Sequence, residues 1–190
     1  EHESVFGVSV VSEDITEQHR AIEEHLAYRS ILGLIVSDTP LVVLLNALAQ
    51  SIEKIFPSAF CYIVHDHEKG NAVTVVPRDS SPIIDLLFPS PSLSQVGDIF
   101  TRVIKERAEI LIPDISRYPS TPFLARLTRS GIRSCWIRPI ILSTGLVWGA
   151  CAIHHKTIAL SPTQTDREHL DVLLRLAATV IERKKFLEQL

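Results

Sequence analysis

The strongest constraint on the fold is a pair of adjacent strands, predicted at 134–142 and 146–154, that are largely apolar on both faces. Side chains in a strand alternate between its two faces. One face of the first strand carries Cys135, Ile137, Pro139 and Ile141, and the other carries Trp136, Arg138, Ile140 and Leu142. The residues Ser-Thr-Gly at 143–145 join the two strands as a hairpin. Because a sheet with two apolar faces has to be covered on both of them, the sequence predicts a three-layered domain.

The second strand of this hairpin shows the same pattern. One set of alternate residues comprises Leu146, Trp148, Ala150, Ala152 and His154, and the other comprises Val147, Gly149, Cys151, Ile153 and His155. His154 and His155 are neighbours and therefore point to opposite sides. They are not expected to chelate one metal ion together.

Two amphipathic helices are predicted to form one cover. The first follows Thr39 as N-cap and Pro40 at the first helical position, and it is ended by Pro57. The second follows Ser161 as N-cap and continues to Leu190. At about 28 residues it is longer than a globular core usually needs, so we expect it to leave the domain.

The other cover is predicted in 77–131, which is irregular in composition. Its first part, 77–96, holds four prolines and five serines, and short helices are predicted at 97–107 and 120–131. A short strand is expected at 109–112, and a further hairpin is expected at 60–66 and 72–76. The fold class is therefore α+β: an antiparallel sheet of about five to six strands. The N- and C-terminal helices pack on one face, and a lid of loops and short helices covers the other.

Charge and cysteine content exclude several classes of function. The net charge of −3 leaves no electrostatic signature of nucleic-acid binding or of contact with an anionic membrane. No apolar run approaches the roughly 18 residues that span a bilayer. Three cysteines in apolar stretches predict reduced, buried thiols and a cytoplasmic location, with any membrane anchor elsewhere in a parent chain. The absence of methionine favours an excised fragment and leaves open that omitted positions alter the spacings.

The hairpin sequence SCWIRPIILSTGLVWGACAIHH resembles the signature hairpin of GAF domains in bacterial signalling proteins. The residues that match are Ser134, Cys135, Trp136, Pro139, Ile140, Gly145 and Gly149. IPDIS at 112–116 resembles the family's short strand, and SPTQTDREHL resembles the start of its closing helix. The resemblance covers roughly 37–185. It implies a non-catalytic sensory domain.

A second resemblance lies near the start of the chain. VVSEDITEQ at 10–18 is similar to the end of a PAS domain, whose last strand closes with an Asp-Ile-Thr turn. We therefore expect four regions, listed in chain order: a PAS-like tail at 1–16, a connecting helix at 17–36, a GAF domain at 37–180, and a linker helix beginning at 181–190. The resemblance implies a covalently linked output domain, such as a diguanylate cyclase, a cyclic-di-GMP phosphodiesterase or a histidine kinase.

A small-molecule pocket is predicted beneath the lid. Its candidate lining combines apolar bodies with a few polar groups: Tyr62, Arg78, Asp98, Trp136, Arg138 and Trp148. An inward Arg138 would need an anion or a carboxylate partner, because an unpaired buried charge is costly. Asp98 as a helix N-cap and Arg78 as a surface residue remain alternatives.

The other reactive side chains have simpler interpretations as structural groups. Cys135 and Cys151 are expected to pack in the core rather than act as nucleophiles. No metal site is expected, because Cys61 and His65 lie roughly 13 Å apart in an extended strand, so a zinc site would need a bend. A weak metal shared by His65 and His67 stays an alternative to surface histidines. No cofactor is expected either, although haem on His154 or His155 stays an alternative. A bilin is disfavoured because none of the cysteines precedes a histidine, as the family's attachment sites require. The family's Asn-Lys-Phe-Asp-Glu constellation for cyclic nucleotides is also missing.

The predicted function is that of a cytoplasmic sensory domain, which binds an unknown small molecule or dimerises to control an output domain. A homodimer is expected through the terminal helices, at Ile22, Leu26, Val180 and Leu187. Two alternatives stay open: a ligand-free dimerisation spacer, and a GAF-type thiol reductase.

Overall fold

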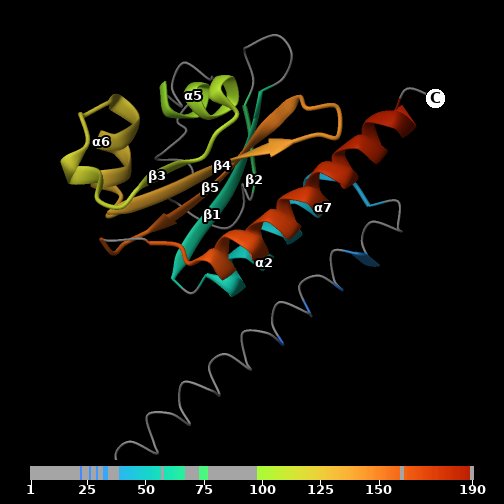
Figure 1. Ribbon diagram of the computed structural model, residues 1–190, viewed down its shortest axis with the longest axis horizontal. Helices are drawn as coiled ribbons and strands as arrows, with labels where there is room; N and C mark the ends of the chain where they lie inside the picture. Colours follow the sequence, from blue (N-terminus) through green and yellow to red (C-terminus); the bar gives the residue numbers. More distant parts are fainter. Residues whose placement is uncertain are drawn as a thin grey trace, which may run out of the picture.

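The computed structural model describes residues 39–56, 58–66, 73–76, 98–158 and 161–188, together with five helical positions between 22 and 33. Its centre is a five-stranded sheet in the order β2-β1-β5-β4-β3, with every neighbouring pair antiparallel. The strands are β1 (Ala59–Asp66), β2 (Val73–Val76), β3 (Ile110–Ile112), β4 (Ser134–Ile141) and β5 (Val147–His155). Figure 1 shows the sheet between two helical layers. The α+β class and the antiparallel sheet are confirmed.

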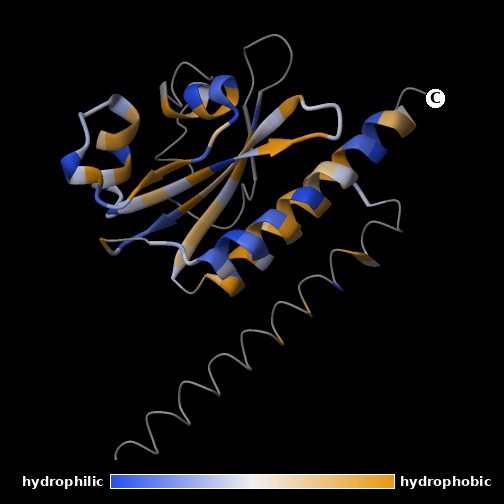
Figure 2. Cartoon of the chain, viewed as in Figure 1, coloured by the Kyte–Doolittle hydropathy of each residue, from blue (hydrophilic) through white to orange (hydrophobic). Residues whose placement is uncertain are grey.

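One layer consists of α2 (Leu41–Ile55) and α7 (Gln164–Glu188), which lie side by side along the sheet (Figure 1). Apolar residues recur at helical spacing in both helices, so each presents one stripe to the sheet. Figure 2 shows these orange stripes alternating with polar, blue positions. The buried residues of this layer include Leu48 and Ile52 of α2 and Leu170 and Leu173 of α7.

The starts of these helices differ from the predicted caps. Pro40, not Thr39, occupies the N-cap position of α2. At α7 the cap is Thr163, whose hydroxyl accepts from the Asp166 backbone N–H at 3.1 Å, while the Asp166 carboxylate accepts from the Thr163 N–H at 2.8 Å. This reciprocal pair is a capping box placed two residues beyond the predicted Ser161.

The second layer consists of α5 (Asp98–Glu106), the single-turn helix η1 (Ile115–Arg117) and α6 (Pro122–Arg129), on the opposite side of the sheet (Figure 1). Thr121 caps α6 by accepting from the Leu124 N–H at 3.2 Å. Phe100, Val103 and Phe123 are fully buried beneath these helices. Both faces of the sheet are therefore covered, as the two apolar faces of the hairpin predicted.

A β-bulge changes the expected facing of one tryptophan. Ile140 pairs with Gly149 but Ile141 pairs with Val147, so Trp148 is an extra residue in β5. We call the face beneath α2 and α7 the helix-covered face, and the face beneath α5, η1 and α6 the lid-covered face. The insertion interrupts the alternation and turns Trp148 toward the helix-covered face with Cys151 and Ile153, away from Ala150 and Ala152. The prediction that Trp148 shares a face with Ala150, Ala152 and His154 is therefore wrong.

The N-terminal predictions fall largely outside the described residues. The PAS-like tail at 1–16 lies there entirely, and of 17–36 only Ile22, Leu26, Arg29, Leu32 and Gly33 are described, all in helical conformation. At the other end α7 continues past residue 180 to Glu188. Among the helices described, none combines the length and the apolar character needed to cross a bilayer.

Candidate functional site

The structure separates the predicted pocket residues between the two faces of the sheet. Tyr62 lies in the core beneath α5 and α6, whereas Trp136 and Trp148 lie in the core beneath α2 and α7. Arg138 projects to the same side as Trp136 and reaches α7. Arg78 lies outside the described residues, and Asp98 begins α5 without a described side chain. Trp136, Arg138 and Trp148 therefore do not share a pocket beneath the lid with Tyr62. The alternation in β4 set which residues belong together, but it did not say which layer each set meets.

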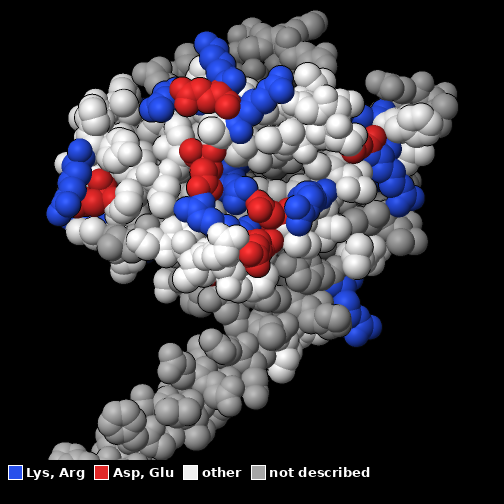
Figure 3. Space-filling model, in the orientation of Figure 1, with Lys and Arg blue, Asp and Glu red and all other residues white. Residues whose placement is uncertain are grey.

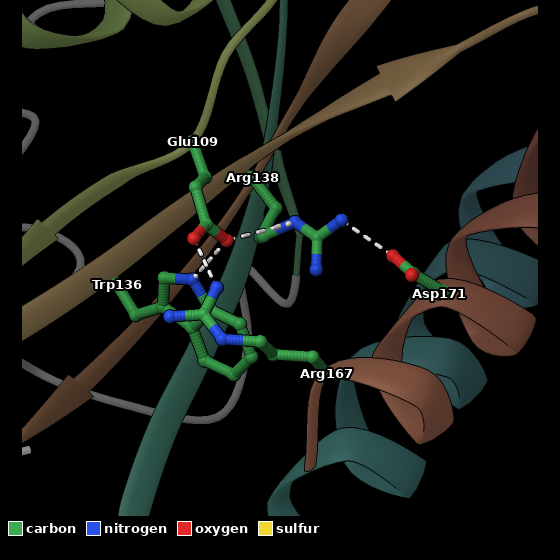
Figure 4. Close-up of polar contacts among 5 residues, drawn as sticks. All are labelled: Glu109, Trp136, Arg138, Arg167 and Asp171. Carbon is green, nitrogen blue, oxygen red and sulfur yellow. Dashed lines mark hydrogen bonds and ion pairs between the residues drawn. The ribbon is translucent and has the colours of Figure 1, made fainter. Parts of the chain in front are cut away.

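A polar network joins β3 and β4 to α7 (Figure 4). Glu109 lies at its centre, immediately before β3. Its Oε2 accepts from the Trp136 indole N–H at 2.9 Å and lies 3.4 Å from the Arg138 guanidinium, and its Oε1 accepts from Arg167 of α7. The other end of Arg138 donates to Asp171 of α7. Two guanidinium groups and two carboxylates are thus paired across the boundary between sheet and helix.

The network is stabilised by its ring as well as by its charges. The Arg138 and Arg167 guanidinium carbons lie 5.7 Å and 5.5 Å from the centre of the Trp136 ring, within the range of cation–π attraction. Burial by itself raises the pKa of Glu109. The hydrogen bonds from Trp136 and Arg167 and the charge of Arg138 outweigh it, so the pKa lies below its usual range. Glu109 is therefore ionised at neutral pH. The expectation that Arg138 needs a carboxylate partner is met twice.

A second contact holds the β4–β5 turn to the same helix. The backbone N–H and the hydroxyl of Ser143 both donate to Glu182 Oε1, at 2.6 Å and 2.7 Å. Glu182 lies 11 residues beyond Asp171, so α7 is attached to the hairpin at two places, within β4 at Arg138 and at the turn that follows β4. On the face that Figure 3 shows, acidic and basic side chains are interleaved rather than gathered by sign.

A different polar pair lies in the core on the lid-covered face. His154 is fully buried, its Nε2 lies 2.9 Å from the Tyr62 hydroxyl, and the two rings stack with centroids 5.0 Å apart. The other ring nitrogen, Nδ1, is buried and has no hydrogen-bond partner among the residues that the structure describes. Burial, helped by the nearby His155, lowers the pKa of His154 to about 3. The ring is therefore neutral at physiological pH, and its buried Nδ1 is unpaired among the described residues.

The three cysteines are fully buried. Cys61 and Cys151 lie on the helix-covered face with their sulfur atoms 3.6 Å apart, and Cys135 lies on the lid-covered face. Burial raises the pKa of Cys135 to about 12, and burial followed by the Cys151 contact raises that of Cys61 well above its usual range. These two thiols remain protonated. In the part of the chain that is described, no three metal-ligating side chains are grouped to hold an ion.

The residues proposed for a dimer interface differ in exposure. Ile22, Leu26 and Leu187 are 57 %, 53 % and 48 % exposed, whereas Val180 is 4 % exposed and packs within its own chain. Val180 is therefore not a surface residue of this chain, because its position on α7 falls on the inward stripe. Sequence reasoning also missed Glu109, Arg167, Asp171 and Glu182. The signals available were the i, i+4 spacing of Arg167 and Asp171 and the need of Arg138 for a counter-charge.

Comparisons with known proteins identify relatives by family and by fold. The GAF domain family matches residues 40–181. A methyl-accepting chemotaxis protein fragment, residues 122 to 287, is 20 % identical, with a TM-score of 0.64 over 84 % of this chain and 99 % of that chain. No curated protein matches the sequence.

Two further solved structures show the range of proteins that share this fold. The free methionine-R-sulfoxide reductase from Neisseria meningitidis, in complex with its substrate, is 15 % identical, with a TM-score of 0.62 over 86 % of this chain and 90 % of that chain. The phycoerythrobilin-bound GAF domain from a cyanobacterial phytochrome is 14 % identical, with a TM-score of 0.62 over 87 % and 97 %. At these identities the likeness concerns the fold alone.

Proposed function

Because this chain belongs to the GAF domain family, we propose that it is a non-catalytic sensory domain of a cytoplasmic signalling protein. A small ligand held between the sheet and the lid sets the position of α7. Helix α7 in turn conveys that position to a linked output domain. GAF domains are typically sensory and regulatory domains. The bound ligand and the linked output domain are our proposal for this chain.

The observation that carries this proposal is the unused Nδ1 of His154. A buried polar atom without a partner costs about 1–3 kcal/mol. A ligand group that hydrogen-bonds to this nitrogen would recover that energy, so occupancy of the lid-covered face is favoured. The neutral ring donates or accepts according to its tautomer.

The surroundings of His154 indicate the kind of ligand. Tyr62 lies 6.2 Å from the Phe100 ring, and Phe100 lies 5.5 Å from the Phe123 ring, both measured between centroids. An uncharged molecule with an apolar or aromatic body and one hydrogen-bonding group matches this environment. A thioether-linked bilin is disfavoured, since Cys135 is buried and protonated and is followed by Trp136 rather than a histidine.

Helix α7 is the proposed output element and dimer interface. Four exposed positions and the partly buried Leu176, which also packs against the core, follow 4-3-4-3 spacing, the pattern of a two-stranded coiled coil: Val172, Leu176, Thr179, Arg183 and Phe186. Val172 and Phe186 are 37 % and 64 % exposed. We propose a homodimer along this stripe, which replaces Val180 as an interface residue. The exposed residues Leu187, Ile22 and Leu26 stay candidate interface residues.

The wider protein context is part of the same proposal. The resemblance of 10–18 to the end of a PAS domain supports a preceding PAS-like domain. A diguanylate cyclase, a cyclic-di-GMP phosphodiesterase or a histidine kinase is the proposed output. No nucleic acid or membrane surface is proposed as a partner of these residues.

Native mass spectrometry of freshly purified protein tests both parts of the proposal. We expect a dimer mass that carries a retained small molecule. His154→Phe should lose the small molecule and keep the dimer, whereas Phe186→Glu should weaken the dimer and keep the small molecule. His155→Phe is the matched control, because the same change is made on the neighbouring residue, which faces the other side of the sheet.

Two rivals make different predictions in the same experiment. A dimer without any retained molecule, unchanged by His154→Phe, would favour the ligand-free spacer. The thiol reductase requires a reactive thiolate. The burial of all three thiols and the raised pKa values of Cys61 and Cys135 argue against it. Haem on His154 would give a Soret absorption band in the purified protein, and we do not expect one.

A further inference from the structure

Glu109 lies in the connection between lid helix α5 and strand β3, and its carboxylate accepts from Arg167 of α7. Helix α5 ends at Glu106, three residues follow, of which Glu109 is the last, and β3 begins at Ile110. Arg107 holds the left-handed conformation with φ of 53°, which disfavours most side chains and persists where the surrounding structure holds it. The path from α5 to Glu109 is therefore a short, sharply turned connection.

The two ends of this connection contact opposite layers. Phe100 and Val103 of α5 are fully buried on the lid-covered face, where Phe100 faces Tyr62. The Glu109 carboxylate instead binds Trp136, Arg138 and Arg167 on the helix-covered face (Figure 4). Because β3 is an edge strand, the connection passes around the edge of the sheet rather than through it.

We infer that Glu109 is a positioning residue that couples helix α5 to helix α7. A displacement of α5 moves the Glu109 carboxylate relative to Arg167, and the N-terminal half of α7 responds. The inference deepens the proposed function, because it names the route by which a change beneath the lid reaches the output helix.

The charges supply two alternative arrangements for this coupling. With Glu109 in place, Arg138 and Arg167 share one carboxylate and are held beside the Trp136 ring. When Glu109 is withdrawn, Arg138 keeps Asp171, whereas Arg167 loses the only carboxylate bonded to it among the described residues. Arg167 is 31 % exposed at its side chain, so its guanidinium can then be solvated. The attachment of α7 at Arg167 is the part that changes.

The Ser143–Glu182 contact provides an internal comparison on the same helix. It holds the C-terminal half of α7 through the β4–β5 turn and involves neither Glu109 nor α5. A change transmitted by Glu109 should therefore appear in residues 167–174 and not in residues 178–186. A change transmitted through the whole core would appear in both segments.

Hydrogen–deuterium exchange of the full chain, read at the amides of α7, tests the coupling without any ligand. The lid helix is perturbed by Phe100→Ala, and the coupling is removed by the isosteric Glu109→Gln. We expect F100A alone to raise exchange in 167–174 about fivefold, the lower end of typical coupling energies. We expect the same change in the E109Q background to add less than about twofold.

Amides of α2 and of 178–186 report any general loss of stability. Equal effects of F100A in the two backgrounds would overturn the inference, as would unchanged exchange of 167–174 in E109Q. If F100A does not fold, Phe100→Leu is the smaller perturbation and is read in the same way. The test does not depend on a ligand, so its failure leaves the native mass spectrometry result intact. A failed ligand search likewise leaves this coupling standing.

Discussion

Arg138 and Asp171 form an ion pair between strand β4 and helix α7, across 33 residues of sequence. The Arg138 side chain is 19 % exposed and that of Asp171 is 41 % exposed, so water screens the pair only in part. Together with Glu109, this pair makes the attachment of α7 to the sheet depend on charge as well as on apolar packing. The predictions below test that attachment and the two cores beside it.

The Arg138–Asp171 pair should show a measurable coupling energy. In a double-mutant cycle of Arg138→Gln and Asp171→Asn, followed by urea unfolding, we expect about 0.5–1 kcal/mol. The control is the Arg102–Glu106 pair on α5, whose side chains are more than half exposed and whose coupling should be smaller. Equal coupling in the two cycles would show that partial burial does not strengthen the pair.

Stability should fall as the pH drops below 6.5, because of His154. The folded-state pKa of His154 is lowered to about 3, so the unfolded state binds a proton first as the pH falls from the ordinary value of 6.5. The stabilisation is complete above pH 6.5. Below that pH the stabilisation decreases by at most about 1 kcal/mol per pH unit, until the pH reaches the folded-state pKa of His154.

Urea unfolding between pH 7.5 and pH 4 measures this slope. His154→Phe should flatten the curve. His155, whose pKa burial also lowers, contributes part of the slope that remains, and toward pH 4 Glu109, whose pKa lies below its usual range, contributes as well. A slope that is the same in wild type and in His154→Phe would show that His154 is not the group that titrates.

Gly149 should not tolerate even a methyl group. A Cβ at this position would lie 2.3 Å from the Val64 carbonyl oxygen. That oxygen is a backbone atom of the neighbouring strand, so it cannot move aside as a flexible side chain would. We expect Gly149→Ala to cost at least about 1–3 kcal/mol, as overpacking does in a core. Gly33→Ala is the control, since the position is helical and no atom of the described residues lies within 4 Å of an added Cβ. That change should be neutral or stabilising in the same chemical denaturation experiment.

The three thiols should react only when the protein unfolds. Cys61, Cys135 and Cys151 are each 0 % exposed. Thiol-specific reagents react with the thiolate form, and burial opposes ionisation of Cys61 and Cys135. Labelling with a maleimide should therefore be slow in buffer and complete in urea, as read by mass spectrometry of the peptides. One thiol that is labelled rapidly in the folded protein would support the reductase alternative.

Local sequence patterns were sufficient for the architecture. The two-residue alternation in 134–142 required covers on both faces of the sheet, and the helical spacing in 41–55 and 164–188 identified one of them. Short helices were expected at 97–107 and 120–131, where α5 and α6 form the second cover, whereas the Pro- and Ser-rich stretch 77–96 lies outside the described residues. The hairpin residues from Ser134 to Gly149 indicated the GAF family. These features depend on side-chain periodicity and turn chemistry, which neighbouring residues determine.

Only the tertiary structure decided which layer each face of the sheet meets. Alternation groups Trp136 with Arg138 but does not orient the group, so the predicted pocket placed both beneath the wrong layer. The bulge at Trp148 comes from the register between two strands, which no single strand encodes. Glu109 and Arg167 are 58 residues apart, and their pairing follows from how β3 and α7 pack. Relations of this kind depend on long-range packing, whereas strands, helices and turns arise from residues close together in the chain.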